Sequence, residues 1–529
     1  MILGKYYFLM LVIFSWISTL DCAGKVVCYF SNWAIYRPGI GKFTSCDILV
    51  KDCTHMIYAF VGLNTTIWSV QVLDYDVDIK QNGFKNFTDL KKTNPQVTFM
   101  VGLGGWGEGG KKYSELVSSM SRRQVFIKHA VEFIKEYHFE GLDVDWEYPG
   151  AKDRDGNPSD YTNFGSFIKE LRFAFNVENP SWQLTIAAPL SDFRLKDGYN
   201  VPALCRSADA IHVMAYDLRI NQDGFAGCHS PLFQSHFNPK TNKSYNVADG
   251  MQLWVDLGCP QEKLVMGMAF YGRSFTLCDN KTHDVDSPVN VQAGGGIAGP
   301  YTQNVGFLSY YEICMDLNCK QNSWTEMWDP VGLCPYMYKG DQWVGYENKT
   351  SLTYKLDYLK CKGYAGAMVW AVDMDDFHGV CGPKYPLIEL IHDSMESYSD
   401  SRRLITFERK MLRTIYGPIF NPETQTYERR SNENIMSLYN KPDILYFIRK
   451  ERLEWFGHAW RADGQLVKNV LINKINKTRP LGRPKTRWID VVAKDIEMID
   501  QDATLETAYK RERWREILMA AMVLNEPLS

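Results

Sequence analysis

The sequence predicts a (β/α)8 barrel with a small α+β insertion between its seventh and eighth strands. Eight short runs of apolar, β-branched or aromatic residues recur between Lys25 and Asp376, and helical periodicity occupies the stretches between them. Most of these runs are almost continuously hydrophobic, which is typical of strands buried on both faces of a parallel sheet. Eight strands alternating with helices over about 350 residues fit a barrel, and a doubly wound open sheet is the alternative that the pattern leaves open.

The helical stretches between the strands are clearest at Ser121–Tyr137 and Tyr161–Phe175, where apolar residues recur every three or four positions. The strands are expected at Lys25–Phe30, His55–Leu63, Gln96–Leu103, Gly141–Glu147, Gln183–Leu190, Ala210–Asp217, Leu264–Tyr271 and Ala365–Val372.

The insertion is predicted from the length of the seventh connection. Residues 272–364 are too many for one crossover, and they include the aromatic segments Gly306–Cys314 and Pro335–Tyr346. We therefore expect a small α+β domain over residues 273–343, on the upper face of the barrel.

The chain changes character after a closing helix predicted at Pro386–Met395, and Ser397–Ser401 marks the expected boundary. Residues 401–529 carry 24 Lys and Arg against 17 Asp and Glu, a net charge of +7, whereas the whole chain of 529 residues has a net charge of −3. The sequence thus predicts a barrel over residues 24–393 and a basic extension over residues 394–529. At 45% hydrophobic and 23% charged, the chain cannot be wholly disordered, collagen-like or a small disulfide scaffold.

The N-terminus predicts export. Lys5 precedes an apolar run from Phe8 to Leu20 that is too short to span a bilayer, so residues 1–23 are interpreted as a signal peptide, with a buried strand or helix as the alternative. No later segment reaches membrane-spanning length. Removal of Cys22 leaves twelve cysteines, an even number suited to an oxidising compartment. Six glycosylation sequons agree with secretion and begin at Asn64, Asn86, Asn242, Asn280, Asn348 and Asn476.

The segment Phe139–Gly150 carries the chemistry. If it forms a strand, period two places Asp143, Asp145 and Glu147 on one face. Three carboxyl groups in a barrel interior repel one another, so at least one must keep a proton near neutral pH, as a general acid does. Glu147 would lie at the C-terminal mouth, where barrel enzymes hold their catalytic groups. The alternative, a solvated acidic turn, conflicts with the apolar residues that alternate with the carboxyls.

This segment resembles the DxxDxDxE signature of glycoside hydrolase family 18, the chitinases. The resemblance extends over about residues 24–393 and includes, in order, CYFSNW (28–33), VGLGGW (101–106), MAYD (214–217), FYGRSF (270–275) and GAMVWAVDMDDF (366–377). It implies a monomeric, secreted endochitinase that cleaves β-1,4 bonds in chitin and chito-oligosaccharides without a cofactor or metal. The alternative functions are those of a chitin-binding lectin with a catalytically weak or inactive site and of a growth-factor-like relative.

The resemblance also implies roles for individual residues. Glu147 is the general acid, Asp145 turns toward it and steadies the substrate's acetamido group, and Asp143 keeps the cluster's protonation in order. Tyr216 and Asp217 hold the acetamido group while its own oxygen attacks the anomeric carbon, giving an oxazolinium intermediate. The substrate-binding residues implied in this way are Tyr29, Phe60, Leu73, Asp74, Gly104, Gly105, Trp106, Gly107, Tyr148, Met214, Ala215, Asp217, Tyr271, Arg273 and Trp370. For Phe60 and Met214, plain core packing is an equal alternative.

Two positions depart from the family pattern. Glu140 stands where the signature has Asp, which is expected to weaken rather than abolish activity, and Gln222 stands near a usual Trp. Three disulfides are implied by the resemblance, namely Cys28–Cys53, Cys314–Cys381 and, more weakly, Cys319–Cys334.

The extension resembles the C-terminal end of reverse transcriptases from non-LTR retrotransposons, in segments such as Arg452–Arg461 and Pro480–Trp488. It lacks the paired aspartates of a polymerase, and a secreted chain rarely meets nucleic acid, so no nucleic-acid partner is expected. It is either a fused segment without function or an exported appendage. We expect low internal order there, apart from separate helices around Phe407–Tyr416, Ile444–Trp460 and Ala503–Leu524.

Overall fold

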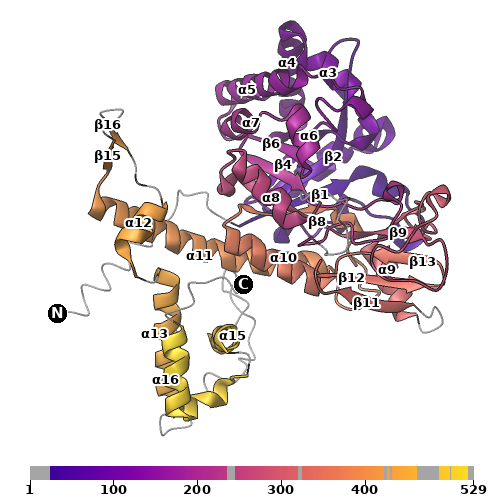
Figure 1. Ribbon diagram of the computed structural model, residues 1–529. Coiled ribbons are helices and arrows are strands. Elements are labelled where there is room, and N and C mark those ends of the chain that lie inside the picture. Colours follow the sequence, from indigo (N-terminus) through magenta and orange to yellow (C-terminus); the bar gives the residue numbers. More distant parts are fainter. Residues whose placement is uncertain are drawn as a thin grey trace. The chain divides into compact units, whose positions relative to one another are not determined.

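The computed structural model describes residues 24–234, 245–319 and 324–421, followed by 426–428, 430, 432–441, 443–461, 488–500 and 502–521. The chain forms two compact units, one over Ala23–Tyr398 and another that holds the residues from Ser399 onward (Figure 1). The predicted signal peptide and the sequons at Asn242 and Asn476 lie outside the described residues.

The first unit is a closed parallel barrel, as predicted, and the open sheet is excluded. Its strands are β1 (Lys25–Ser31), β2 (His55–Asn64), β4 (Thr98–Gly104), β5 (Gly141–Asp145), β6 (Gln183–Pro189), β7 (Ala210–Met214), β8 (Leu264–Ala269) and β14 (Gly366–Trp370). They pair in the order β1-β14-β8-β7-β6-β5-β4-β2, and pairing of β1 with β2 closes the ring. A further strand, β3 (Ser69–Val72), pairs antiparallel with β2.

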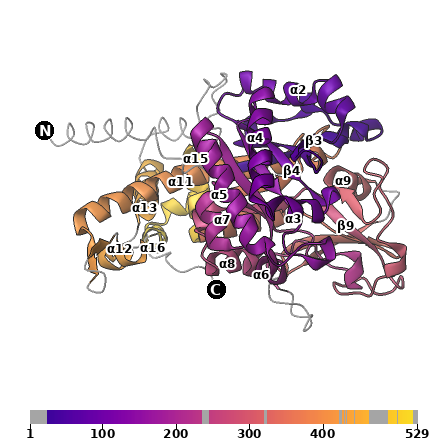
Figure 2. The same cartoon turned by 90° about the horizontal axis from the view of Figure 1, so that it is seen from above.

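Helices surround the barrel (Figure 2). In α4 (Met120–Glu136) the buried residues Phe126, Ala130 and Phe133 recur at helical spacing and face the strands, and Ser119 caps the helix by accepting the N–H of Arg122. The other helices of this unit are α2 (Gly83–Asp89), α3 (Lys111–Val117), α5 (Asp160–Glu178), α6 (Asp192–Gly198), α7 (Val201–Ser207), α8 (Val247–Asp256) and α10 (Lys349–Lys362).

The predicted insertion is a five-stranded sheet with one helix. Its elements are β9 (Tyr271–Thr276), β10 (Phe307–Ser309), α9 (Tyr310–Asn318), β11 (Thr325–Asp329), β12 (Cys334–Lys339) and β13 (Gln342–Gly345), with strand order β10-β9-β13-β12-β11. Phe275, Tyr336 and Trp343 form part of a small core of its own. Because β9 follows β8 after one residue, the insertion continues directly from the barrel wall.

Four disulfides stabilise this unit. The structure joins Cys28 to Cys53 and Cys314 to Cys381, the two pairs that the family resemblance implies, and it adds Cys205–Cys259 and Cys228–Cys334. The expected Cys319–Cys334 pair is therefore wrong, and Cys319 is a free, exposed thiol. The reason is a non-local contact: the N–H of Leu232 donates to the carbonyl of Gly332 at 2.7 Å, which brings the 228–232 segment beside β12.

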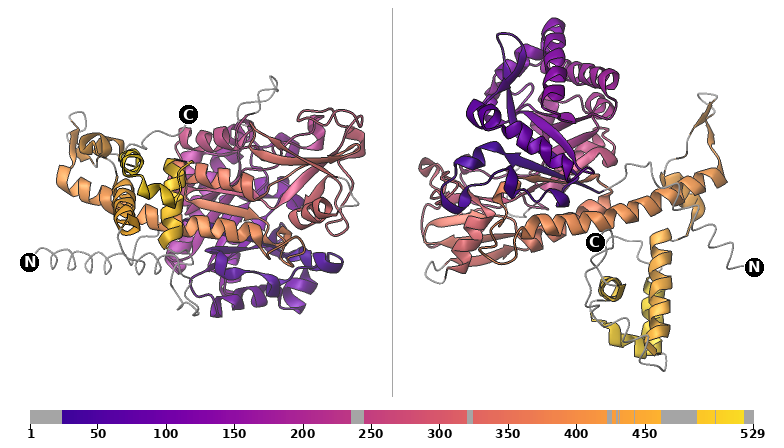
Figure 3. Two further views of the ribbon diagram at one scale, coloured as in Figure 1. Left: turned by 90° about the horizontal axis from the view of Figure 1, so that it is seen from below. Right: turned by 180° about the vertical axis from the view of Figure 1, so that it is seen from behind.

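The boundary expected at Ser397–Ser401 does not interrupt the helix there. Helix α11 runs without a break from Pro386 to Tyr416 and is the long orange helix in Figure 3. Tyr398, inside the expected boundary, is buried and donates its hydroxyl to the carbonyl of Tyr364 at 2.9 Å.

The second unit has more internal order than the sequence led us to expect. Its elements beyond α11 are β15 (Ile419–Asn421), β16 (Thr426–Glu428), α12 (Asn432–Tyr439), α13 (Ile444–Arg461), α15 (Trp488–Ile499), a 3-10 helix (Leu505–Tyr509) and α16 (Arg511–Ala520). Phe456, Val492 and Trp514 belong to one buried cluster that α13, α15 and α16 share. The expectation of separate helices is wrong here, because amphipathic helices bury their apolar faces against one another.

None of the helices within the described residues is both long enough and apolar enough to cross a bilayer.

A chain that ends at Ser399 should keep the fold of the first unit, because the barrel core lies wholly within Ala23–Tyr398. A chain that ends at Met395 loses the buried Tyr398 and its hydrogen bond, and we expect it to be less stable by about 2–4 kcal/mol. Thermal unfolding of both secreted chains measures the difference. Equal stability of the two, or unfolding of the Ser399 chain, would contradict this boundary.

Candidate active site

A cleft of about 1540 Å³ opens at the C-terminal ends of the barrel strands. Strand β5 delivers Asp143 and Asp145, and Glu147 follows in the turn after the strand, which ends at Asp145 rather than at Glu147. Asp145 and Glu147 line the cleft, whereas Asp143 lies beneath it and is fully buried. The sequence pattern therefore places the three carboxyl groups at increasing height from the interior to the mouth.

The Asp143 carboxylate is held by donors from three other strands. Tyr29 donates its hydroxyl to Oδ2 at 2.6 Å, and Thr185 donates to Oδ1 at 2.5 Å. His212 Nδ1 lies 3.1 Å from Oδ1 and 3.1 Å from the Tyr29 hydroxyl. These hydrogen bonds fix the position of the Asp143 carboxyl group beneath the other two.

The two upper carboxyl groups favour the protonated form. Burial raises the pKa of Glu147 to about 7, against the opposing charge of Arg154. Burial, and then the charges of Glu147 and Asp143, raise the pKa of Asp145 well above its usual range. A carboxyl group that keeps its proton near neutral pH, as Glu147 does with a pKa of about 7, is what a general acid requires.

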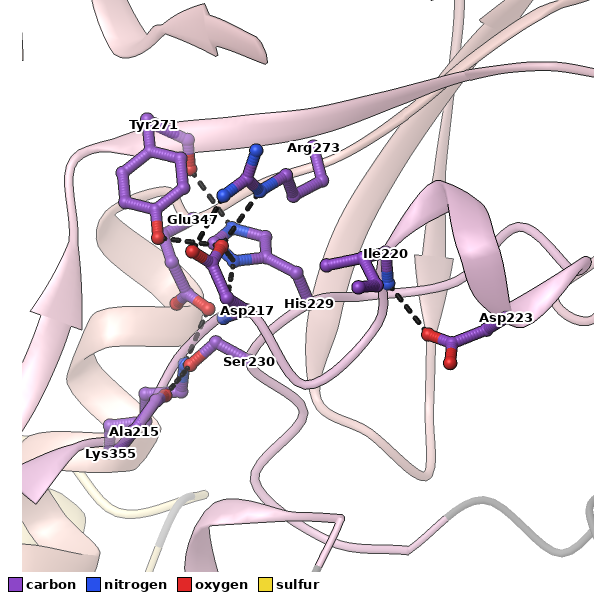
Figure 4. Close-up of polar contacts among 10 residues, drawn as sticks. All are labelled: Ala215, Asp217, Ile220, Asp223, His229, Ser230, Tyr271, Arg273, Glu347 and Lys355. Atoms are coloured by element: carbon purple, nitrogen blue, oxygen red, sulfur yellow. Dashed lines mark hydrogen bonds and ion pairs between the residues drawn. The ribbon is translucent and has the colours of Figure 1, made fainter. Parts of the chain in front are cut away.

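Strand β7 ends at Met214, and the turn after it, which carries Tyr216 and Asp217, faces these carboxyl groups. Arg273 binds the Asp217 carboxylate through two bonds, Nε to Oδ1 at 2.7 Å and Nη2 to Oδ2 at 2.6 Å, and Tyr271 donates its hydroxyl to Oδ1 at 2.8 Å (Figure 4). Although desolvation opposes the shift, Arg273 and then His229 hold the pKa of Asp217 well below its usual range. Asp217 is therefore a permanent acceptor, unlike Asp145 and Glu147.

Aromatic rings form the floor and one wall of the cleft. Phe60 stacks on Trp370 with ring centroids 5.6 Å apart, and Tyr29 lies 5.4 Å from Trp370. Trp106 stands at the mouth with 61% of its surface exposed, and the guanidinium of Arg154 lies 3.9 Å from the centre of its ring. Exposed flat apolar rings beside hydrogen-bonding groups are suited to binding the faces of sugar rings.

Most residues expected to bind substrate meet in this cleft. The lining includes Tyr29, Phe60, Leu73, Asp74, Gly104, Gly105, Trp106, Gly107, Tyr148, Met214, Asp217, Tyr271, Arg273 and Trp370, together with Tyr216. Ala215 is the exception: it is fully buried, does not line the cleft, and its carbonyl accepts the Ser230 hydroxyl at 2.6 Å.

Sequence reasoning missed polar residues that support or line the site. Thr185 and His212 interrupt the apolar runs of β6 and β7, and a polar residue inside a buried strand is a signal that could have found them. Trp33, Tyr36 and Arg194 also line the cleft, but they lie in a 3-10 helix (Asn32–Tyr36) and in the short helix α6, where no long periodic pattern marks them.

Glu140 contacts none of the site carboxyl groups. It lies at the start of β5, the end of the strand away from the mouth, where its carboxylate binds Lys91 at 2.8 Å and accepts the N–H of Phe99 at 2.9 Å. Its role in the structure is to tie β5 to its neighbours, so the change from Asp at this position acts on packing rather than on the chemistry. Gln222, by contrast, lines the cleft and is exposed.

A parallel barrel with a protonated carboxyl pair facing an aromatic cleft defines a glycosidase of the (β/α)8 class. The sequence model described as Glycosyl hydrolases family 18 matches residues 25–375, so the chain belongs to this family. It is 50% identical over 380 residues to an endochitinase of Manduca sexta, covering 72% of this chain and 69% of that protein.

Two solved structures mark the range of similar folds. The Group IV chitinase of Ostrinia furnacalis is 39% identical with a TM-score of 0.67, covering 70% of this chain and 99% of that one. Human YKL-39, described as a pseudo-chitinase with retained chitooligosaccharide binding, is 33% identical with a TM-score of 0.64, covering 70% and 100%.

The pKa of Glu147 sets the pH dependence of hydrolysis. A general acid acts only while protonated, so kcat should fall as the pH rises through about 7, by close to tenfold per unit above that value. A pH–rate profile measured between pH 5 and 9, with thermal unfolding checked at each pH, tests this expectation. A rate that stays level or rises above pH 8 would exclude Glu147 as the group that limits the alkaline side.

Proposed function

We propose that this protein is a secreted endochitinase that hydrolyses β-1,4 bonds between N-acetylglucosamine units. The observation that carries the proposal is the pairing of a protonated Glu147 with Asp145 at the mouth of an aromatic cleft, opposite Tyr216 and Asp217. The similarity to the endochitinase of Manduca sexta, over most of the barrel unit, supports the same substrate class.

The mechanism follows from the site. Glu147 donates its proton to the glycosidic oxygen as the bond to the leaving sugar breaks. Asp217, the ionised carboxylate of the cleft, is already bound by Arg273 and Tyr271, so the substrate's own acetamido oxygen attacks the anomeric carbon, and the configuration is retained after water opens the ring. Asp145 and Tyr216 hold the acetamido group in line with the anomeric carbon.

The alternative is a lectin that binds chitin oligosaccharides without cleaving them, and human YKL-39 is described as such a pseudo-chitinase with retained chitooligosaccharide binding. Gln222 favours the alternative because it removes an aromatic platform from the cleft. The enzyme is favoured because Asp143, Asp145 and Glu147 are all present and raised pKa values suit the upper two to proton transfer. A single assay of the secreted chain on chito-oligosaccharides separates the two functions.

Export is part of the proposal and is supported by the apolar N-terminal run and by four disulfides, which persist in oxidising compartments. We further propose that the barrel over residues 24–393 acts as a monomer and that the extension over residues 394–529 contributes neither to catalysis nor to nucleic-acid binding.

Replacing Glu147 with Gln keeps the shape of the side chain and removes the proton donor. Turnover of chito-oligosaccharides should fall by about 100- to 10,000-fold, while binding of the uncleaved oligosaccharide remains within a few-fold of wild type. The matched control is Glu140→Gln, which removes a carboxylate from the other end of the same strand and should retain turnover. Near-normal turnover in Glu147→Gln would falsify the assignment of the general acid.

Replacing Gln222 with Trp restores an aromatic surface to the cleft and should tighten binding of long oligosaccharides. A stacked ring contributes about 0.5–1.5 kcal/mol, so KM for a hexasaccharide should fall about two- to tenfold, with little change for a disaccharide analogue. Gln124→Trp, on the outer face of α4, controls for the added indole. Equal effects of both substitutions would show that position 222 does not bind sugar.

A further inference from the structure

The substrate-binding turn after β7 rests on a buried charged group that does not line the cleft. We propose that Lys355, paired with Glu347 and acting through Ser230, is a positioning residue that fixes the turn bearing Tyr216 and Asp217 (Figure 4). This role rests on the function proposed above and extends it to residues outside the cleft.

The connection is short and continuous. Lys355 on α10 donates from Nζ to the Ser230 hydroxyl at 2.6 Å and also binds Oε1 of Glu347. The Ser230 hydroxyl then donates to the carbonyl of Ala215 at 2.6 Å. Because the Lys355 ammonium can only donate, the Ser230 oxygen accepts from it, and the single hydroxyl proton of Ser230 is available to the carbonyl of Ala215.

The ion pair is completely removed from solvent, with 0% of the Lys355 side chain and 1% of the Glu347 side chain exposed. Burial lowers the pKa of Lys355, and the charge and hydrogen bond of Glu347 oppose that shift. Desolvating two charges costs several kcal/mol each, and a buried pair often stabilises a fold no better than apolar side chains of the same volume. We therefore expect this ion pair to fix the position of Ser230 and the turn rather than to raise the free energy of unfolding.

The turn needs such support because its backbone is unusual. Asp217 has φ of 56°, in the left-handed region that residues other than Gly seldom adopt. Such a conformation persists only where the surroundings determine it.

His229, the residue before Ser230, also holds the turn that carries Asp217. The N–H of Asp217 donates to Nδ1 of His229 at 3.3 Å, and the N–H of Leu218 donates to the carbonyl of His229 at 2.8 Å. His229 Nε2 lies 3.1 Å from the carbonyl of Tyr271, and Nδ1 also lies 3.6 Å from Oδ1 of Asp217, so the ring contacts both the backbone and the carboxylate of Asp217. His229 thus holds the distal half of the turn, and Ser230 with Lys355 holds the proximal half at Ala215.

The opposite side of the turn leaves no room for adjustment. A Cβ on Gly267 of β8 would lie 2.9 Å from the Ala215 nitrogen and 2.8 Å from the ring of Tyr216. Loss of the Ser230 bond therefore releases the turn in one direction only, away from β8. A displacement of about 1 Å at a group that orients the reacting acetamido group can lower the rate by up to about 100-fold.

Three variants of the full chain test the proposal. Ser230→Ala removes the hydroxyl and keeps the ion pair, Lys355→Met breaks the pair, and Lys355→Met with Glu347→Leu replaces both charges by apolar groups. The control is Lys360→Met with Asp357→Leu, which removes an exposed ion pair of 2.8 Å from the same helix. The measurements are Tm, and kcat and KM on chito-oligosaccharides, with kcat normalised to the folded sites counted by oligosaccharide-binding stoichiometry.

We expect Ser230→Ala and the double replacement to lower kcat per folded site at least about tenfold, with KM changed less than about threefold. The double replacement should recover most of the Tm lost in Lys355→Met without recovering kcat, which separates positioning from stability. If Ser230→Ala or the double replacement turns over at the wild-type rate, the positioning role is excluded. An inactive wild-type chain would instead contradict the proposed function itself.

Discussion

Mutual repulsion among carboxyl groups is the constraint on which the rest of this site depends. Asp143, Asp145 and Glu147 follow one another at alternate positions, and their surroundings are largely closed to water. Because like charges repel, the three groups cannot all be ionised at once. Their surroundings differ, and Asp143, the deepest of the three, is contacted by Tyr29, Thr185 and His212. Burial raises the pKa of both upper members, and the charge of Asp143 adds to this effect at Asp145.

A fourth carboxyl group, Asp217, enters the same cleft without upsetting this order. Arg273 neutralises it through two hydrogen bonds and Tyr271 supplies a third. The pKa values of two carboxyl groups in the cleft are therefore shifted in opposite directions. Asp217 stays ionised, whereas the pKa of Glu147 is raised to about 7. The insertion provides Arg273 and Tyr271 on β9, so the added sheet takes part in the electrostatics of the barrel mouth as well as in its shape.

Local patterns in the sequence were sufficient for the barrel and for the carboxyl groups, because strand burial and period-two spacing are properties of short segments. They failed where distant segments meet. The pairing of Cys228 with Cys334 depends on a loop and strand β12, which lie side by side only in the fold. Glu140 departs from the family signature, and the local pattern carries no information on its partners Lys91 and Phe99, which come from other parts of the chain. The two units divide between Tyr398 and Ser399, within the boundary expected at Ser397–Ser401, but composition did not show that one helix, α11, runs through it.

The contact between Arg154 and Trp106 has a consequence for affinity. The guanidinium covers one face of the indole, donates from Nη2 to the Trp106 carbonyl at 2.5 Å and from Nε to the Glu147 carbonyl at 3.0 Å. The ring therefore has one face left for a sugar, and its rotational freedom is already spent in the empty enzyme. Immobilising a side chain on binding costs about 0.5–1.5 kcal/mol. A ring that is already fixed before binding avoids this cost, so the free energy of sugar binding is more favourable by that amount. The exposed tryptophan at the mouth therefore presents one open, prearranged face to a sugar ring.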